Sequence, residues 1–196
     1  MAPEITTLST SSRRASRGCL AGILLAIALA VGFVWTALHS AEEARRHREE
    51  TLAAYARKEV ARVKSGEHAA SLWNADQIRM LAADPDCVRN LATLHCMMDE
   101  RTGPGVSELK KLVNVRHITF YSLDTDQVLA AAKGMPSIEE LSFSSTGPSD
   151  ESIRSFAAFP NLKKLRFDFL DQQRERLIRE TVPAVEIELP PPEPKE

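Results

Sequence analysis

The sequence predicts an α/β fold: a short solenoid with parallel strands on one face and helices on the other, preceded by a transmembrane helix and a helical spacer. Three observations predict this organisation. One apolar block has the length of a membrane span, a stretch of helix-forming residues without Gly or Pro follows it, and an apolar pattern then recurs every 23 or 24 residues. The formal net charge of −2 excludes the strong basic excess typical of nucleic-acid-binding proteins, so no nucleic-acid partner is predicted.

The apolar block, Cys19–Leu38, is twenty residues long and contains no charged side chain. As a helix it would measure about 30 Å, the thickness of the hydrocarbon core of a bilayer. Three arginines precede the block and three follow it: Arg13, Arg14, Arg17, Arg45, Arg46 and Arg48. Because Glu42 and Glu43 separate the second group from the block, the charges favour a cytoplasmic N-terminus. We predict an uncleaved signal anchor, and a signal peptide cleaved near Ser40 is the alternative.

A juxtamembrane spacer, residues 39–66, follows the predicted span and is rich in strong helix formers. A narrow apolar stripe runs along it: Leu52, Ala56, Val60 and Val63. Two interpretations are open. The spacer is either a solvated helix that lifts the distal domain off the membrane, which we favour, or a short seam between two parallel copies of the chain.

The remaining chain contains four units that begin at residues 91, 115, 138 and 162, spaced 24, 23 and 24 residues apart. Each unit starts with an apolar-x-x-apolar-x-apolar pattern, which predicts a short strand. Three columns of apolar residues result: Leu91, Val115, Ile138 and Leu162; then Leu94, Ile118, Leu141 and Leu165; then Cys96, Phe120, Phe143 and Phe167. Apolar residues at steps of three follow in the first three units and predict one helix face: Val106, Leu109 and Leu112; then Leu129, Ala132 and Met135; then Ile153, Phe156 and Phe159.

Residues that cap or end helices stand at the positions that this alternation of strands and helices requires. Thr125-Asp126 and Ser149-Asp150 stand where helix N-caps are expected, and Pro136 and Pro160 end two of the helices. In the last unit Arg176 and Arg179 replace apolar residues, so its helix is predicted to turn Leu177 and Ile178 toward the core. A closing strand is predicted near residues 185–189.

This pattern resembles the leucine-rich repeat family in its bacterial and cysteine-containing form. Residues 138–161 match best, through Ile138, Leu141, Phe143, Thr146, Ser149, Asp150, Ile153, Phe156, Phe159 and Pro160. The chain departs from the family at the ninth position of a unit, which is Thr146 once but Asp99, Leu123 and Leu170 elsewhere. The resemblance implies stacked units whose strand face binds a partner. With a cytoplasmic N-terminus, the repeats are expected on the other side of the membrane, the periplasmic side of a bacterial inner membrane.

The chain is thus predicted to consist of six segments. They are a disordered cytoplasmic tail (1–18), a membrane helix (19–38), the spacer (39–66), an N-terminal helical cap (67–90), the repeats with their closing strand (91–189) and a Pro-rich disordered tail (190–196). On the cap, Trp73, Ile78 and Leu81 are predicted to form one apolar helix face.

The outward positions of the predicted strands supply the candidate partner-binding face: Met97, Arg116, His117, Tyr121, Glu139, Glu140, Lys163, Lys164 and Phe169. Its charges alternate in sign from unit to unit, which predicts pairing across neighbouring strands, Arg116–Glu139–Lys163 and His117–Glu140–Lys164. Simple complementarity of the sheet surface explains these charges. Met97, Tyr121 and Phe169 are the anchors expected if the face binds a protein.

No pattern in the sequence predicts catalysis, a cofactor or a metal site, and we expect a protein that is not an enzyme. Cys87, His95 and Cys96 invite a metal interpretation, but neighbouring residues of a strand point to opposite sides and cannot easily share one ion. A Cys87–Cys96 disulfide and a buried Cys96 thiol both remain open.

We therefore predict a membrane-anchored protein–protein interaction module that binds an unidentified protein on the strand face of its repeats. The alternative is a structural membrane protein that assembles through its transmembrane and spacer helices and forms a weak homo-oligomer.

Overall fold

The computed structural model describes residues 12–97, 104–121, 125–144 and 147–189, and of residues 12–26, Ala28 and Pro104 it describes the backbone alone. The chain divides into two compact units, Met1–Glu50 and Thr51–Glu196. Helix α1 (Ser12–Lys64) supplies the described part of the first unit and the opening segment of the second. It begins ahead of the predicted span, so residues 12–18 are helical where the sequence suggested a disordered tail.

Apolar side chains of α1 in the first unit are exposed, among them Phe33 at 76% and Trp35 at 70%. The start of the predicted span, residues 19–26, falls outside the side chains that the structure describes. Within the described side chains, no helix carries an apolar stretch long enough to cross a bilayer. Residues 1–11 and 190–196, which the sequence assigns to two tails, also lie outside the described residues.

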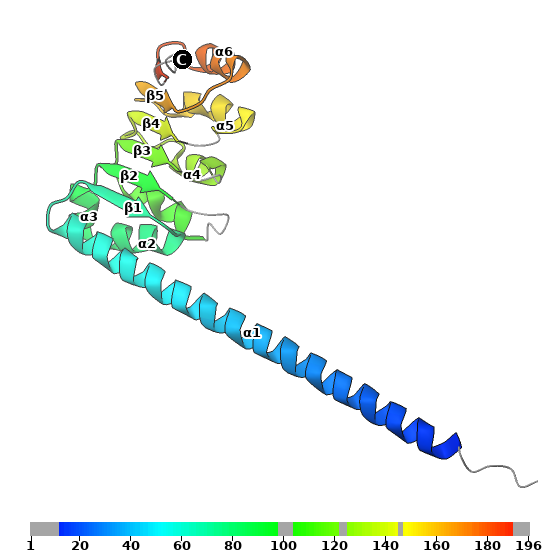
Figure 1. Cartoon of the computed structure of the whole chain (residues 1–196). Helices are drawn as coiled ribbons and strands as arrows, with labels where there is room; N and C mark the ends of the chain where they lie inside the picture. The colour runs from blue at the N-terminus through cyan, green and yellow to red at the C-terminus, as the bar shows by residue number, and fades with distance from the viewer. Residues whose placement is uncertain (1–11, 98–103, 122–124, 145–146, 190–196) are drawn as a thin grey trace, which may run out of the picture. The chain divides into compact units, whose positions relative to one another are not determined.

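The second unit is built on a six-stranded parallel sheet in which every strand pairs with the next one along the chain. Figure 1 shows the labelled strands stacked in chain order. The strands are β1 (Ala69–Leu72), β2 (Thr93–Cys96), β3 (His117–Phe120), β4 (Glu140–Phe143), β5 (Lys164–Phe167) and β6 (Glu186–Glu188). The closing strand is therefore where the sequence predicted it, and Ile187 pairs with Leu165.

The predicted apolar columns become rows across the sheet. Leu94, Ile118, Leu141 and Leu165 are register partners on successive strands, and each has no exposed surface. In the next row Phe143 stacks on both neighbours, with ring centroids 5.1 Å from Phe120 and 4.9 Å from Phe167. Offset aromatic stacks of this kind add to the stability that burial alone provides.

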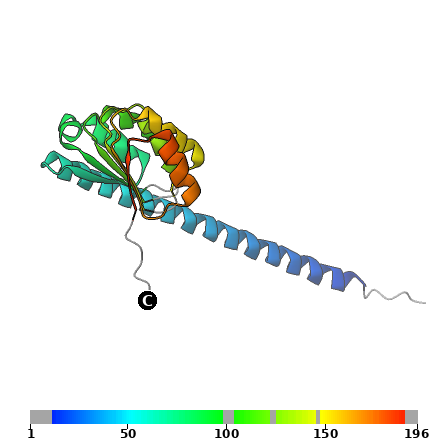
Figure 2. The same ribbon diagram turned by 90° about the horizontal axis from the view of Figure 1, so that it is seen from above.

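Helices cover one face of the sheet, and Figures 1 and 2 show α4, α5 and α6 side by side there. The helices after α1 are α2 (Ala75–Ala83), α3 (Pro85–Asn90), η1 (Pro104–Lys111), α4 (Thr125–Ala132), α5 (Asp150–Arg154), η2 (Ser155–Ala158) and α6 (Gln172–Thr181), of which η1 and η2 are 3₁₀ helices. The three predicted apolar helix faces are all buried, and Ile178 of α6 points into the core as expected.

The segment predicted as a helical cap, residues 67–90, contains a strand as well as two helices. Residues 69–72 form β1 and pair with β2, with Ala70 opposite Leu94 and Leu72 opposite Cys96. The sequence did not indicate this strand because AASL contains no β-branched residue; the strand forms against the edge of β2. Ile78 and Leu81 are buried as predicted, but Trp73 precedes α2 and is 42% exposed.

The end of α1 belongs to the same packed unit. Val63 is fully buried in the core, Ala56 is 3% exposed, and Val60 packs against the same core. Polar contacts hold this turn of helix: the Asn90 side chain donates to the Val63 carbonyl at 3.0 Å, and Lys64 pairs with Asp84 at 2.8 Å. The C-terminal part of the predicted apolar stripe, Ala56, Val60 and Val63, thus packs within the chain.

Candidate functional site

The face of the sheet opposite the helices carries the predicted binding residues. Because side chains alternate along a strand, every second residue points to this outward face. Two outward rows run in register across all six strands: Ala69, Thr93, His117, Glu140, Lys164 and Glu186; then Ser71, His95, Thr119, Ser142, Arg166 and Glu188. The next step of the alternation, just past the strand ends, adds Trp73, Met97, Tyr121, Ser144 and Asp168.

The half of this face over β4, β5 and β6 is occupied by ion pairs. Arg166 lies 3.0 Å from Glu140 and 2.8 Å from Glu188. Lys164 approaches Glu188 at 2.5 Å and Glu186 at 3.8 Å. Hydrogen bonds from Lys164 and Arg166 lower the pKa of Glu188. These charges therefore neutralise one another across the strands, as expected if they serve the packing of the sheet surface.

The predicted charge pairs are present only in part. His117 lies 3.7 Å from Glu140, and Lys163 lies 3.0 Å from Glu139, as the alternation suggested. The hydrogen bond from Lys163 lowers the pKa of Glu139, and the charge of Arg116 adds to the effect. Glu140 binds Arg166, whereas the predicted partner Lys164 turns toward β6. The sequence analysis missed Arg166, although its place two residues after Lys164 puts it on the same face.

The half of the face over β1, β2 and β3 is neutral and aromatic. Trp73 and Tyr121 are 42% and 45% exposed, and Met97 lies between them in the row. The ring of Tyr55 on α1 lies 6.4 Å from that of Trp73, and the imidazole of His95 lies 6.1 Å from the Tyr121 ring. His95 also carries a buried Nδ1 without a hydrogen-bond partner. We call Tyr55, Trp73, His95, Met97 and Tyr121 the aromatic row.

Phe169, the third predicted anchor, is 74% exposed, beyond the end of β5. Its strand lies two places from that of Tyr121 in the sheet order. Trp73 and Tyr55, by contrast, join the aromatic row although the sequence analysis did not include them. Trp73 was assigned to a helix face, and nothing local indicated that Tyr55 would lie beside it.

Both described cysteines are buried thiols. Cys87 and Cys96 are free, so the disulfide that the sequence left open is not formed. Burial raises the pKa of Cys96 to about 12 and that of Cys87 to about 11. Within the described part of the chain, no group of His, Cys, Asp and Glu side chains could hold a metal ion.

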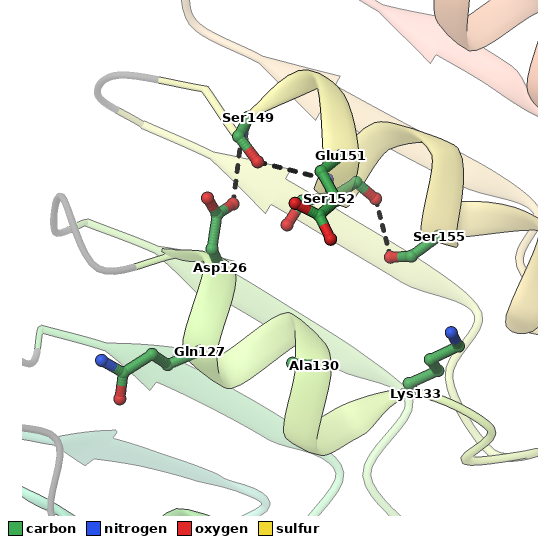
Figure 3. Close-up of a pocket in the computed structure, with 8 residues that line it drawn as sticks. All are labelled: Asp126, Gln127, Ala130, Lys133, Ser149, Glu151, Ser152 and Ser155. Carbon is green, nitrogen blue, oxygen red and sulfur yellow. Dashed lines mark hydrogen bonds between the residues drawn. The ribbon is translucent and has the colours of Figure 1, made fainter.

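A polar cleft of about 360 Å³ lies on the helix side, between α4 and α5. Figure 3 shows its polar groups bonded to one another. Asp126 accepts a hydrogen bond from the Ser149 backbone N–H at 3.1 Å, and the Ser149 hydroxyl accepts from Ser152 N–H at 3.2 Å, capping α5. Burial raises the pKa of Asp126, but hydrogen bonds from Ser152 and Ser149 outweigh it, so the net pKa is lowered. This cleft joins two neighbouring units and leaves few free groups for a ligand.

Comparisons of the chain with protein-family models, with curated proteins and with solved structures give no match. Function is therefore inferred from the residues of this chain alone.

Proposed function

We propose that this protein is a membrane-anchored interaction module that binds a partner protein on the strand face of a short leucine-rich-repeat solenoid. The observation that supports it is the aromatic row over β1, β2 and β3, in which Tyr55, Trp73 and Tyr121 are exposed and His95 and Met97 are half-buried. Aromatic residues and Met are enriched where proteins bind one another, because they bury much surface at low entropic cost.

The sheet register supports the repeat part of the proposal. Residues 24 or 23 positions apart are neighbours on adjacent strands, as Leu94, Ile118 and Leu141 are. A unit of that length can bury its strand and its helix only against the next unit, which is the defining property of a solenoid. The pairing of β1 with β2 extends the array by one unit toward the N-terminus.

The anchor part of the proposal rests on the uncharged run Cys19–Leu38. The continuous backbone helix of α1 supports it, because only helices and closed barrels satisfy backbone groups within a bilayer. Exposed apolar side chains such as Leu29 and Phe33 have no cover within the described chain, as expected for a lipid-facing surface. Protease protection of intact cells tests the predicted side, since cleavage of the repeats only after permeabilisation would reverse the orientation.

The neutral half of the strand face is the expected contact surface, because the charges of the other half already have partners. Burying these paired charges under a partner would cost desolvation free energy, and the partner would offer them no new ion pair in return. The aromatic row instead offers apolar area that is not already occupied by ion pairs.

Site-specific photocrosslinking in living cells tests the proposal. A photoreactive phenylalanine analogue replaces Tyr121 in the full chain, and in a matched variant it replaces Ala130 on the helix side. We expect a discrete crosslinked partner from position 121 and none from position 130. Adding Trp73→Ala should reduce that crosslink at least about tenfold, the usual effect of losing an aromatic hot spot.

Two controls accompany this measurement. Arg154→Ala changes an exposed residue on α5 and should leave the crosslink unchanged. The thermal unfolding midpoint of Trp73→Ala reports whether the variant is folded, since Trp73 lies outside the buried core. A crosslink that persists in a folded Trp73→Ala variant, or one that arises equally from position 130, would contradict binding on the strand face.

The alternative is a structural membrane protein that assembles through its transmembrane and spacer helices, and the packing of the spacer makes us favour it less. The spacer residues Val60 and Val63 pack against the core of the same chain.

A further inference from the structure

A second cleft opens where strands β1, β2 and β3 begin. Its volume is about 530 Å³, and seven polar or basic residues line it: His68, Arg89, Asn90, Thr93, Asn114, Arg116 and His117. The rest of its lining is apolar or neutral, and no acidic residue contributes to it. Volumes of this size are typical of sites for small ligands.

The sheet itself brings these residues together. The backbone N–H groups of Ala92 and Thr93 both donate to the His68 carbonyl, and those of Arg116 and His117 both donate to the Ala92 carbonyl. His68, Ala92 and Arg116 therefore occupy equivalent positions at the starts of three successive units, with His68 and Arg116 each 24 residues from Ala92. Residues that are distant in sequence become the wall of one cleft because the repeat spacing places them side by side.

Side-chain amides hold the wall in place. Asn90 donates to the Val63 carbonyl at 3.0 Å, and Asn114 donates to the carbonyls of Val88 and Arg89 at 3.3 and 3.1 Å. His68 is oriented by a 2.8 Å contact between Nδ1 and the Asn90 carbonyl. These bonds fix the backbone from which Arg89 projects, so the site is organised before any ligand arrives.

The two guanidinium groups are largely uncommitted. Among the described residues, Arg116 has no ion pair within 4 Å and no side-chain hydrogen bond, and its effect on Glu139 acts through charge at a distance. Arg89 lies 3.4 Å from Asp86, but both side chains are more than half exposed, and such exposed pairs contribute little. A guanidinium carries five N–H donors in a planar fork that matches the oxygens of a phosphate group.

We propose that this cleft binds a phosphate group, carried either by a small soluble phosphomonoester or by a lipid headgroup. Two arginines and two histidines line one cleft, and the carboxylates near them, Asp86 and Glu140, lie outside its lining. This donor set favours a ligand with several oxygens and up to two negative charges over a single carboxylate. The inference does not rest on the proposed protein-binding function. The cleft lies at the start of the strands, whereas Trp73, Met97 and Tyr121 lie at their ends.

Calorimetric titration of the full chain in a neutral detergent tests the proposal. The probes are inorganic phosphate, glycerol phosphate and acetate, and lipid vesicles with and without phosphatidic acid form a separate arm. We expect saturable binding of a phosphate probe, weaker binding of acetate, and a loss of at least about tenfold in affinity for Arg116→Gln. Binding in the soluble arm alone identifies a phosphomonoester, and binding in the vesicle arm alone identifies a lipid headgroup.

Arg154→Gln is the matched control, because it removes an exposed arginine on α5 that is not part of the cleft lining. Its affinity for phosphate should equal that of the unmodified chain. Arg116→Gln should keep its thermal unfolding midpoint, because the Arg116 side chain has no bonded partner to lose. Absence of saturable binding in both arms, equal binding of acetate and phosphate, or equal losses in the two variants would overturn the proposal. Photocrosslinking from position 121 is unaffected by any of these outcomes.

Discussion

The Glu59 carboxylate on α1 accepts a hydrogen bond of 3.0 Å from the backbone N–H of Ser71 in β1. β1 is the first strand of the sheet and has a neighbour on one side only. An uncovered edge of this kind is a template for pairing with another chain. Helix α1 therefore closes the sheet at its N-terminal end, and Glu59 makes the polar contact that allows a helix to do so.

Removing this carboxylate should destabilise the fold. Glu59→Ala leaves the Ser71 N–H without its acceptor and takes away the 2.7 Å partner of Arg62. We expect the free energy of unfolding to fall by about 1–3 kcal/mol, measured by urea denaturation. Glu59→Gln keeps an acceptor oxygen and should lose less. Lys58→Ala, an exposed change on the same helix, should stay within about 0.5 kcal/mol, and equal losses at positions 58 and 59 would refute the edge contact.

The phenylalanine stack offers a sharper test of the core. Phe143 is 2% exposed and stacks on both Phe120 and Phe167. Phe143→Ala should cost about 3–5 kcal/mol in unfolding free energy, because it removes buried surface and leaves a cavity between two rings. Phe169→Ala, the same change at a 74% exposed site, should cost about 0.5 kcal/mol or less. Similar costs at the two sites would show that the row is not packed as described.

The Asp126 carboxylate is expected to stabilise the fold by an amount that depends on pH. Burial alone would raise the pKa of this carboxyl, but hydrogen bonds from Ser152 and Ser149 lower the net pKa below the ordinary value of 3.8. A group with a lowered folded pKa stabilises the fold above its unfolded pKa, and that contribution is lost as the pH falls through the folded pKa. The unmodified chain should therefore exceed Asp126→Asn in unfolding midpoint at pH 7, and the gap should close below about pH 4.

Asp126→Ala provides the companion measurement. Asn can still accept the hydrogen bond from Ser149 N–H, whereas Ala cannot. Part of the loss in Asp126→Ala should accordingly persist at low pH. A difference between the unmodified chain and Asp126→Asn that is constant from pH 7 to pH 3 would show that the charge of Asp126 is not what stabilises the junction of α4 and α5.

Thiol reactivity tests the burial of the two cysteines. With the pKa of Cys96 at about 12, only about one thiol in ten thousand is ionised at pH 8, and the thiolate is the reactive form. In the folded chain, alkylation of Cys87 and Cys96 should be at least about a hundredfold slower than that of a cysteine placed at the exposed Ala130. Denaturation should equalise the rates. Peptide mapping without reductant that recovers a linked Cys87–Cys96 pair would contradict the free thiols.

Most of the parallel sheet was predictable from the spacing of the apolar residues. The columns through Leu94 and Phe120 are buried as expected, and the closing strand and the inward turn of Ile178 are both confirmed. The prediction succeeded because the same apolar pattern recurs every 23 or 24 residues. A strand that is ambiguous in one segment can therefore be placed by comparison with the next segment. The prediction failed at the N-terminal end, where residues 69–72 carry too little pattern to indicate β1.

The candidate site was predicted less completely than the fold. Alternation along a strand identifies which side chains face outward, and Tyr121 and Glu140 were found in this way. Alternation does not tell which neighbour a long charged side chain will choose. Glu140 meets Arg166 instead of Lys164, because Lys164 has two glutamates available on β6.

The sequence by itself determined the inward residues and their register, because a period of 23 or 24 residues leaves one way to align the strands. Only the tertiary structure decided what covers the first edge of the sheet and how Tyr55 meets Trp73. The physical reason is that a repeat encodes contacts between copies of itself. Helix α1 does not carry the recurring pattern, so its Val60 and Val63 could have faced water, a second chain or the sheet domain. They pack into the core of the sheet domain.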